Sequence, residues 1–162
     1  MNVLQKYVTI LQNIKIMIPF VRTVQEAKLV IDEMALHGLV RGNDGLELVM
    51  MCEIPSNVIL IEEFSRYFDG FSIGSNDLTQ TTMGIDRDSA LVSPIFDERD
   101  PAVKKMLTKA IKGANAVGAY IGICGQAPSD FPELAEFLIK TGINSLSLTP
   151  DTVIPFLMRY AP

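Results

Sequence analysis

Several residue types are scarce in this chain of 162 residues. It has no Trp, aromatic residues make up only 7% of the sequence, and there is one His. The core must therefore be built mainly from Val, Ile, Leu and Met, which is compatible with a hydrophobic content of 48%. The two cysteines, Cys52 and Cys124, match neither a CxxC metal spacing nor a disulfide framework. This cysteine usage favours a reducing, cytoplasmic compartment.

Long apolar runs and basic clusters are also missing. The longest apolar runs are far shorter than the roughly 18 residues that a membrane span requires. The N-terminal residues MNVLQK do not have the layout of a secretory signal. The net charge is -5, and no Lys/Arg cluster of the kind that binds nucleic acid is present. We therefore expect an acidic, soluble protein with no membrane and no nucleic-acid partner.

The main pattern in the chain is an alternation of short β-like runs with helical segments. The β-like runs are short, several are continuously apolar, and polar or turn residues follow each one. Such runs are typical of strands buried on both faces of a parallel sheet. They cover residues 14–19, 47–53, 70–75, 119–125 and 145–150.

Helical segments separate the β-like runs. Thr23-Val24-Gln25-Glu26 has the pattern of a capping box, which predicts a helix that ends near His37. The repeated βα units predict an α/β fold with right-handed crossovers. Residues 75–101 are rich in Asp, Thr and Ser and are predicted to form a long loop, which after a strand is usually functional or disordered. Further helices are predicted over residues 56–68, 101–117, 133–141 and 151–160.

Two carboxylates follow neighbouring predicted strands. Glu53 ends the second β-like run and Asp77 follows the third, so their strands should lie about 5 Å apart. In a (β/α)₈ barrel, catalytic residues come from the carboxyl ends of several strands. Mg²⁺ commonly takes one or two protein carboxylates, and this pair suits it. The alternative is a helix N-cap for Asp77 and a rim salt bridge for Glu53.

The two cysteines receive different interpretations. Cys124 ends the fourth β-like run, and the following Gly125 permits close approach of another backbone. From the residues alone, a buried and inert thiol is the favoured reading of Cys124, because free Cys is among the most buried residue types. Cys52 faces away from Glu53 by strand alternation and is predicted to lie in the core.

The arginines and the histidine leave alternatives open. Arg87 lies among Asp residues in Gly84-Ile85-Asp86-Arg87-Asp88, and Arg22 follows the first β-like run. Each is either an ion-paired surface residue or a bidentate phosphate ligand. His37 lies at a predicted helix C-terminus and is interpreted as a helix cap rather than a catalyst.

Six motifs together resemble one family. In order, they are IMIPFVRTVQEA, MMCEIPSN, FDGFSIGSNDLTQTTMGIDRDS, FDERDPAV, GICGQAPSD and SLSLTPDTV. They resemble the C-terminal region of the phosphoenolpyruvate (PEP) synthase family, the pyruvate, water dikinases. Relatives are pyruvate phosphate dikinase and enzyme I of the bacterial sugar phosphotransferase system, which tends to carry Glu where this chain has Gln126. The resemblance covers Ile14 to Pro155, and several long motifs in order are highly specific.

The resemblance implies a fold and domain boundaries. It implies the C-terminal portion, about five βα units, of a (β/α)₈ TIM-type barrel over residues 14–162. Residues 1–13 do not match the family well and are predicted to form an uncertain, possibly helical N-terminal segment.

The resemblance also implies roles for individual residues. Glu53 and Asp77 are similar to the family's Mg²⁺ ligands, with Mn²⁺ as a possible substitute. Cys124 resembles the general acid/base that exchanges a proton with the C3 carbon of pyruvate enolate. The residues implied to bind substrate are Asn76 with the neighbouring Ser75, Arg87 at the transferred phosphoryl group, Gly125 and Arg22.

The implied reaction moves a phosphoryl group from a phosphohistidine to pyruvate enolate and forms PEP. A metal chelated by pyruvate stabilises the enolate as a Lewis acid. Arginine neutralises charge on the transferring phosphoryl group, and a thiol of tuned pKa can exchange the carbon-bound proton.

Some parts of the family's enzymes are not found in this sequence. A full barrel averages about 250 residues, and five of its eight units take roughly 156, so we expect the chain to begin mid-barrel. The ATP-using nucleotide domain and the phosphohistidine domain should be missing partners, and the chain alone is expected to be inactive. A homodimer or oligomer is expected, because family members dimerise through this barrel. Two alternatives are a non-catalytic interaction module and a different Mg²⁺-dependent barrel enzyme acting on pyruvate-like acids, but the SNDLTQ and ICGQ motifs argue against the latter.

Overall fold

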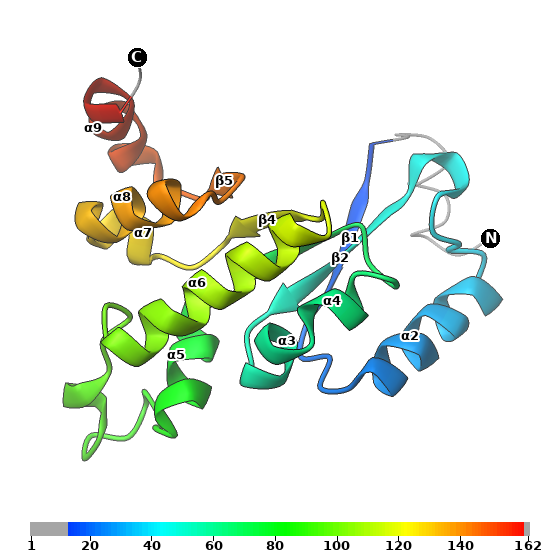
Figure 1. The fold of residues 1–162 in the computed structure, drawn as a ribbon, viewed down its shortest axis with the longest axis horizontal. Helices are drawn as coiled ribbons and strands as arrows, with labels where there is room; N and C mark the ends of the chain where they lie inside the picture. The colour runs from blue at the N-terminus through cyan, green and yellow to red at the C-terminus, as the bar shows by residue number, and fades with distance from the viewer. Residues whose placement is uncertain (1–12, 161–162) are drawn as a thin grey trace.

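The computed structural model describes residues 13–160, which form one parallel sheet with helices in its connections (Figure 1). The strand order is β1-β2-β3-β4-β5, so each strand pairs with the next one along the chain. All five β-like runs contain a strand: β1 (Lys15–Ile18), β2 (Glu47–Cys52), β3 (Gly70–Ile73), β4 (Tyr120–Ile123) and β5 (Ser145–Leu146). The last strand is much shorter than the predicted run 145–150, and Pro150 already belongs to a helix. The helices are α2 (Val24–Leu36), α3 (Pro55–Ile59), α4 (Ile61–Phe64), α5 (Ser75–Met83), α6 (Pro101–Ala116), α7 (Ala127–Asp130), α8 (Pro132–Thr141) and α9 (Pro150–Tyr160).

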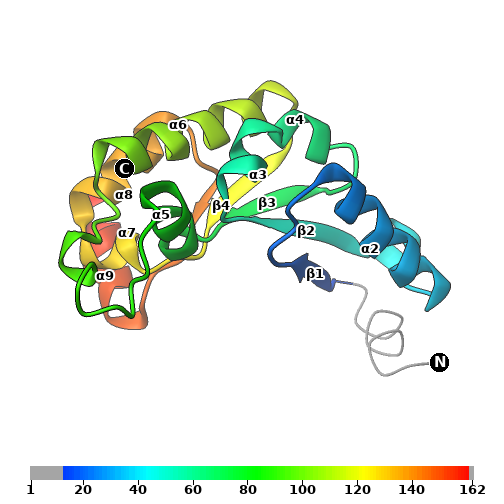
Figure 2. The same ribbon diagram turned by 90° about the horizontal axis from the view of Figure 1, so that it is seen from below.

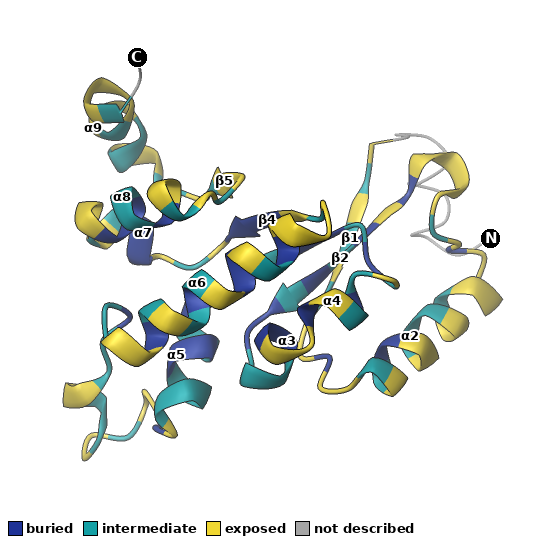
Figure 3. Ribbon diagram, in the orientation of Figure 1, coloured by how far each residue is buried: buried dark blue, intermediate teal, exposed yellow. Residues whose placement is uncertain are grey.

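The core lies between one face of the sheet and the helices that cover it. Helix α6 packs against α3, α4, β3 and β4, and these helices lie together on one side of the strands (Figures 2 and 3). The parallel register aligns buried side chains in rows across neighbouring strands. The rows are Met50–Phe71–Ile121 and Cys52–Ile73–Ile123.

The opposite face of the sheet is less well covered. Met17 of β1 is 45% exposed and Tyr120 of β4 is 46% exposed. The prediction that the strands are buried on both faces is therefore wrong for the described part of the chain. The apolar runs are continuous even though the helices α3, α4 and α6 shield only one face of these strands.

The predicted helix starts are largely confirmed. Thr23 Oγ1 accepts a hydrogen bond of 3.0 Å from Glu26 N at the start of α2. The Glu26 carboxylate accepts from Arg22 N at 2.7 Å, one residue before the position that a capping box uses. At the start of α6, Asp100 Oδ1 accepts from Ala102 N at 2.7 Å.

Two helix predictions are wrong. Residues 56–68 do not form one helix, because the chain breaks at Leu60 between α3 and α4. Leu60 is an ordinary helix former, and nothing in the local sequence marks this break. The predicted loop over residues 75–101 begins with helix α5, which has few apolar side chains and therefore no clear helical period. Leu78 and Thr79 are the buried side chains on one side of α5. The helix ends at Gly84, which has a left-handed backbone conformation with φ of 64°.

Two further expectations concern membranes and the N-terminus. Within residues 13–160, no helix combines the length and the apolar character needed to cross a membrane. Apart from Asn13, the predicted segment 1–13 lies outside the described residues.

Candidate active site

Polar residues follow the carboxyl ends of the strands, which meet at one edge of a parallel sheet. The loop after β1 contains Phe20, and Glu53 directly follows β2. Ser75 and Asp77 lie in the first turn of α5 after β3, and Cys124 directly follows β4. The fold therefore brings most of the predicted site residues to one edge.

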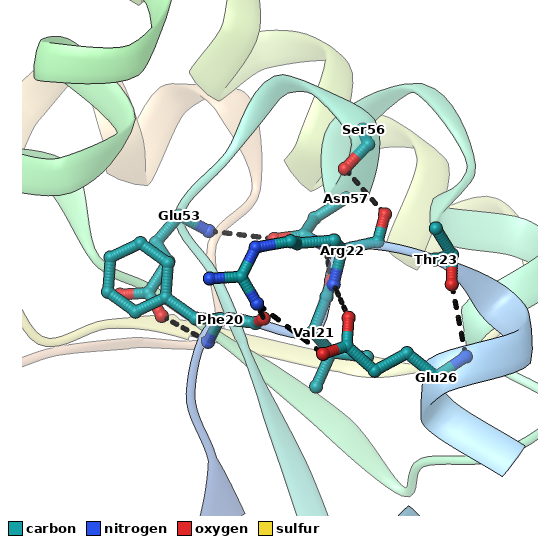
Figure 4. Close-up of polar contacts among 8 residues, drawn as sticks. All are labelled: Phe20, Val21, Arg22, Thr23, Glu26, Glu53, Ser56 and Asn57. Atoms are coloured by element: carbon teal, nitrogen blue, oxygen red, sulfur yellow. Dashed lines mark hydrogen bonds and ion pairs between the residues drawn. The ribbon is translucent and has the colours of Figure 1, made fainter. Parts of the chain in front are cut away.

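Glu53 is the most buried carboxylate of this edge, with 1% of its surface exposed. Its Oε1 accepts a hydrogen bond of 2.7 Å from Phe20 N (Figure 4). Burial raises the pKa of Glu53, the Phe20 hydrogen bond lowers it, and the charge of Asp77 raises it further; the net pKa is raised. Asp77 is therefore close enough to Glu53 to act on it electrostatically.

A buried side chain, Asn57, supports the loop that carries Glu53. Its Oδ1 accepts from Glu53 N at 3.2 Å, and its Nδ2 donates to Val21 O at 2.6 Å (Figure 4). The same Oδ1 also accepts from Ile54 N at 3.2 Å. Phe20, in the same β1 loop as Val21, has a φ of 51°, which is strained for a bulky residue. Sequence reasoning missed Asn57, although it lies in the MCEIPSN motif just after Glu53.

The alternatives proposed for the two carboxylates are not found. The N-cap of α5 is Gly74, and Asp77 makes no side-chain cap there. Among residues 13–160, no salt bridge reaches Glu53. A cation between the two carboxylates would offset the desolvation and repulsion that raise the pKa of Glu53.

The donor set fits a hard divalent cation. No cluster of three or more His, Cys, Asp or Glu side chains suited to a metal occurs in the described part of the chain. A metal held by Glu53 and Asp77 would therefore complete its shell with water or ligand oxygens, as Mg²⁺ usually does.

Cys124 and Cys52 have opposite environments. The Cys124 thiol is exposed, and its Sγ lies 3.5 Å from Ile73 O. The interpretation of Cys124 as a buried thiol is therefore wrong, because β4 ends before it and leaves it at the rim. Cys52 is buried in the core as predicted, and burial, followed by the charge of Glu53, raises its pKa to about 12.

Gly125 is in close contact with Ser75. A Cβ atom added at Gly125 would lie 1.7 Å from Ser75 Oγ, so no larger residue fits without displacing the serine. Ser75 is fully buried. The expected close approach at Gly125 is confirmed, and it joins the loop after β4 to the start of α5.

Two neighbouring pockets open at this edge and share Gln126. Asn76 and Arg87 line the larger pocket, of about 340 Å³, and Cys124 and Gly125 line the smaller one, of about 200 Å³. The larger pocket, here named the arginine pocket, is lined by Asn76, Arg87, Asp88, Ser93, Phe96, Glu98, Gln126 and Asp130. The smaller pocket, the thiol pocket, is lined by Cys124, Gly125, Gln126, Ser129, Ser147, Leu148 and Thr149. A further pocket between α7, α8 and α9 contains none of the predicted site residues.

Of the predicted site residues, Glu53, Asp77, Ser75 and Arg22 line neither pocket. Arg22 makes its contacts in the loop after β1 and at the start of α2. Its Nη1 donates to Phe20 O at 3.0 Å and lies 3.4 Å from Glu26 Oε1. Its side chain is mostly exposed and lines neither pocket. A substrate contact for Arg22 stays a prediction.

Sequence reasoning gave no role to several residues that line the pockets, among them Glu98, Ser147 and Thr149. Glu98 lines the arginine pocket from the FDERDP motif, which carried the resemblance without a role for this side chain. Ser147 and Thr149 line the thiol pocket. Their position directly after β5, at the same edge as the other strand exits, was the available signal.

A comparison with known protein families identifies the family of this chain. Residues 3–160 match the family described as PEP-utilising enzyme, PEP-binding domain. The chain belongs to the PEP-utilising enzyme family. The resemblance seen in the six motifs is thereby confirmed at the family level.

Curated relatives of this chain are PEP synthases. The chain is 61% identical over 151 residues to PEP synthase of Synechocystis sp., and the match covers 93% of the chain. It is 60% identical over 144 residues to PEP synthase of Escherichia coli, covering 89% of the chain. In both cases the chain spans 18% of the relative's length.

Solved structures with the same fold come from aldolases and lyases. An HpcH/HpaI aldolase/citrate lyase family protein from Burkholderia cenocepacia aligns with a TM-score of 0.61, over 90% of this chain and 61% of that protein. An HpcH/HpaI aldolase from Desulfitobacterium hafniense aligns with a TM-score of 0.59, over 96% of this chain and 66% of that protein. At 15% identity these likenesses concern the fold alone. They confirm the prediction of a portion of a TIM-type barrel.

Proposed function

We propose that this chain forms the metal- and substrate-binding part of a PEP synthase, and that it transfers a phosphoryl group from a phosphohistidine to pyruvate enolate. The observation that carries this proposal is the meeting of three features at one sheet edge. These features are the carboxylate pair, the arginine pocket and the exposed thiol in the adjoining pocket. The names of the relatives support the same reaction.

In this proposal, Glu53 and Asp77 hold one Mg²⁺ or Mn²⁺ ion. When bound, the ion supplies Lewis-acid stabilisation of the enolate oxygen. The Phe20 N–H holds the Glu53 carboxylate. The hydrogen bonds between Asn57 and the loops after β1 and β2, here named the Asn57 clamp, keep the Glu53 loop in place. Little reorganisation is therefore needed when ligands arrive.

The arginine pocket binds the phosphoryl end of the ligand. The guanidinium of Arg87 neutralises charge on the transferring group, where positioning and electrostatics dominate catalysis. Asn76 offers a side-chain amide to the substrate from the first turn of α5.

Cys124 moves the carbon-bound proton. Its thiolate takes a proton from the C3 methyl group of pyruvate, and the electron pair of the C–H bond delocalises onto the carbonyl oxygen. That oxygen then accepts the phosphoryl group as the bond to the histidine nitrogen breaks. In the reverse direction, the Cys124 thiol returns the proton to C3.

The test uses a hybrid enzyme and matched cysteine variants. This chain replaces the corresponding segment of the Escherichia coli synthase, to which it is 60% identical. Exchange of pyruvate methyl protons with deuterated solvent is then followed by NMR. Cys124→Ala should abolish exchange, whereas Cys52→Ala, the buried control, should leave it intact. Equal loss in both variants, or no exchange in the unmodified hybrid, would refute the assignment.

A second candidate function is that of an interaction module. It is favoured by apolar side chains on α9 that lie in solvent, with Ile154 64%, Leu157 49% and Met158 84% exposed. In this reading, the chain associates with other chains and performs no chemistry. Self-association together with a catalytically silent hybrid would favour this alternative.

A further inference from the structure

The arginine pocket contains a buried carboxyl group for which the reaction above has no role. Glu98 lies between the short turn Ser93–Ile95 and helix α6, and only 6% of its surface is exposed. Its Oε1 is buried and has no hydrogen-bond partner. The Ser75 hydroxyl lies beside this carboxyl group, but its geometry falls short of a hydrogen bond.

The charges around Glu98 are mostly negative. Asp97 belongs to the same loop, Asp130 comes from α7, and Arg87 faces Glu98 from the segment after α5. Burial raises the pKa of Glu98, and Asp130 and Asp97 raise it further, whereas the Ser75 hydroxyl and Arg87 act in the opposite direction; the net pKa is raised. The exposed Asp88 also lines the pocket, so Arg87 is the only cationic side chain beside three carboxyl groups among the described residues that line it. Asp97 lies outside this lining and is paired with Arg99 at 2.9 Å.

This arrangement conflicts with the binding of an anion. An ionised Glu98 would repel the phosphoryl group that Arg87 attracts. A neutral carboxylic acid in the same place has an O–H group that can donate a hydrogen bond to an anionic oxygen. A buried acid that is kept neutral so that it can donate is a known device for stabilising oxyanions.

We propose that Glu98 works as a neutral acid and donates a hydrogen bond to an anionic oxygen of the ligand in the arginine pocket. This inference rests on the proposed function, because it assumes that a phosphorylated ligand enters that pocket. Glu98 then acts as a ligand-contacting residue beside Asn76 and Arg87. As it ionises, it changes from a donor into a repelling charge, so ligand affinity should fall as the pH rises through its pKa.

The first experiment needs no ligand. The whole 162-residue chain, carrying ¹³C in the glutamate side-chain carboxyl groups, is titrated by NMR, and Glu98→Gln identifies the resonance. That resonance should keep its protonated position after the exposed glutamates have ionised. If Glu98 titrates together with the exposed glutamates, this inference is overturned, and the function proposed above is untouched.

The second experiment uses PEP as the probe, at millimolar concentration and over a range of pH. Glu98→Gln keeps a neutral donor, so it should retain affinity and lose the decline with pH. Glu98→Ala should weaken binding about tenfold or more, the cost of losing a hydrogen bond to a charged group. Asp130→Asn removes a charge from the same pocket without touching Ser75, and it should preserve the decline with pH.

Two results of the second experiment would overturn the ligand contact. One is equal affinity in the unmodified chain and Glu98→Ala. The other is a chain with a neutral Glu98 that binds no PEP at any pH. Proton exchange in the hybrid enzyme depends on Cys124 and tests the proposed function separately.

Discussion

At the scale of single residues, the positions of Glu53 and Asp77 lead to a testable prediction about metal binding. Asp77 lies close enough to raise the pKa of the buried Glu53, and no salt bridge among residues 13–160 reaches Glu53. Mn²⁺ or Mg²⁺ should therefore raise the thermal unfolding temperature of the chain, since an ion that binds only the folded state stabilises it by mass action.

The matched variants for this prediction differ in charge and not in size. Glu53→Gln and Asp77→Asn should each abolish the shift in unfolding temperature, whereas Glu62→Gln, on the outer helix α4, should leave it unchanged. A shift that survives in both site variants would place the metal elsewhere.

The hydrogen bonds of Asp69 lead to a second prediction for a single residue, which concerns how the stability of the fold depends on pH. Burial alone would raise its pKa, but hydrogen bonds from Arg41 Nε at 2.9 Å and Leu48 N at 2.8 Å outweigh burial and lower it. Because the pKa of Asp69 is lower in the folded chain than its unfolded value near 3.8, the ionised carboxylate stabilises the fold at pH values above 3.8. This stabilisation is lost as the pH falls through the folded-state pKa.

Urea unfolding at several pH values tests this expectation. Asp69→Asn should be less stable than the unmodified chain at pH 7, and the difference should shrink toward acid pH. A difference that stays constant from neutral to acid pH would mean that Asp69 acts through packing rather than charge.

At the scale of elements, the Asn57 clamp joins the loops after β1 and β2. Asn57→Ala leaves the buried Glu53 N–H, the Ile54 N–H and the Val21 carbonyl without partners. Each unsatisfied buried group costs about 1–3 kcal/mol, so we expect a loss of at least about 2 kcal/mol in the free energy of unfolding.

The control for the clamp is Ser56→Ala. It removes one hydrogen bond of 2.9 Å to Arg22 O from a partly exposed site, and it should cost about 1 kcal/mol or less. Asn57→Ala should also weaken the metal response of Glu53. Equal costs for the two variants would contradict the clamp.

The elements also show which parts of the fold the sequence predicts. The strands were predictable because several of their apolar runs are continuous and polar or turn residues follow each run. Helix α6 was predictable because Asp100 and Pro101 mark its start. Helix α5 was missed because its sequence has no periodic pattern of apolar residues. It is held instead by the burial of Leu78 and Thr79.

Some features of the candidate site were predictable from the sequence and others were not. Strand alternation and strand order were enough to place Glu53 next to Asp77 and to send Cys52 into the core. The exposure of Cys124 was not predictable from its residue type, which is usually buried. Glu98 was also missed, because its sequence position does not show that it is buried near Ser75 and Asp130, both distant in sequence.

At the scale of the whole molecule, the sheet has two open edges within the described residues. β1 pairs only with β2, and β5 pairs only with β4. Open parallel edges and the exposed apolar face of α9 favour association with other chains. Sedimentation should therefore show a dimer or larger species, and a monodisperse monomer would contradict the argument.

The chain alone should also form no PEP from ATP and pyruvate. Its only histidine, His37, ends helix α2 and lies 3.0 Å from Glu33 Oε1, remote in sequence from every strand exit. A coupled assay on the purified chain tests this expectation. Turnover comparable to that of a full-length synthase would refute it.

The contrast between the two cysteines has a practical consequence for spectroscopy. Burial raises the pKa of Cys52 to about 12, so it carries almost no thiolate at neutral pH, while Cys124 lies exposed beside the thiol pocket. A maleimide dye or a trifluoromethyl tag should therefore attach to Cys124 alone, without any engineered cysteine. The unmodified chain thus offers a built-in labelling position from which occupancy of its own pockets can be followed by fluorescence or ¹⁹F NMR.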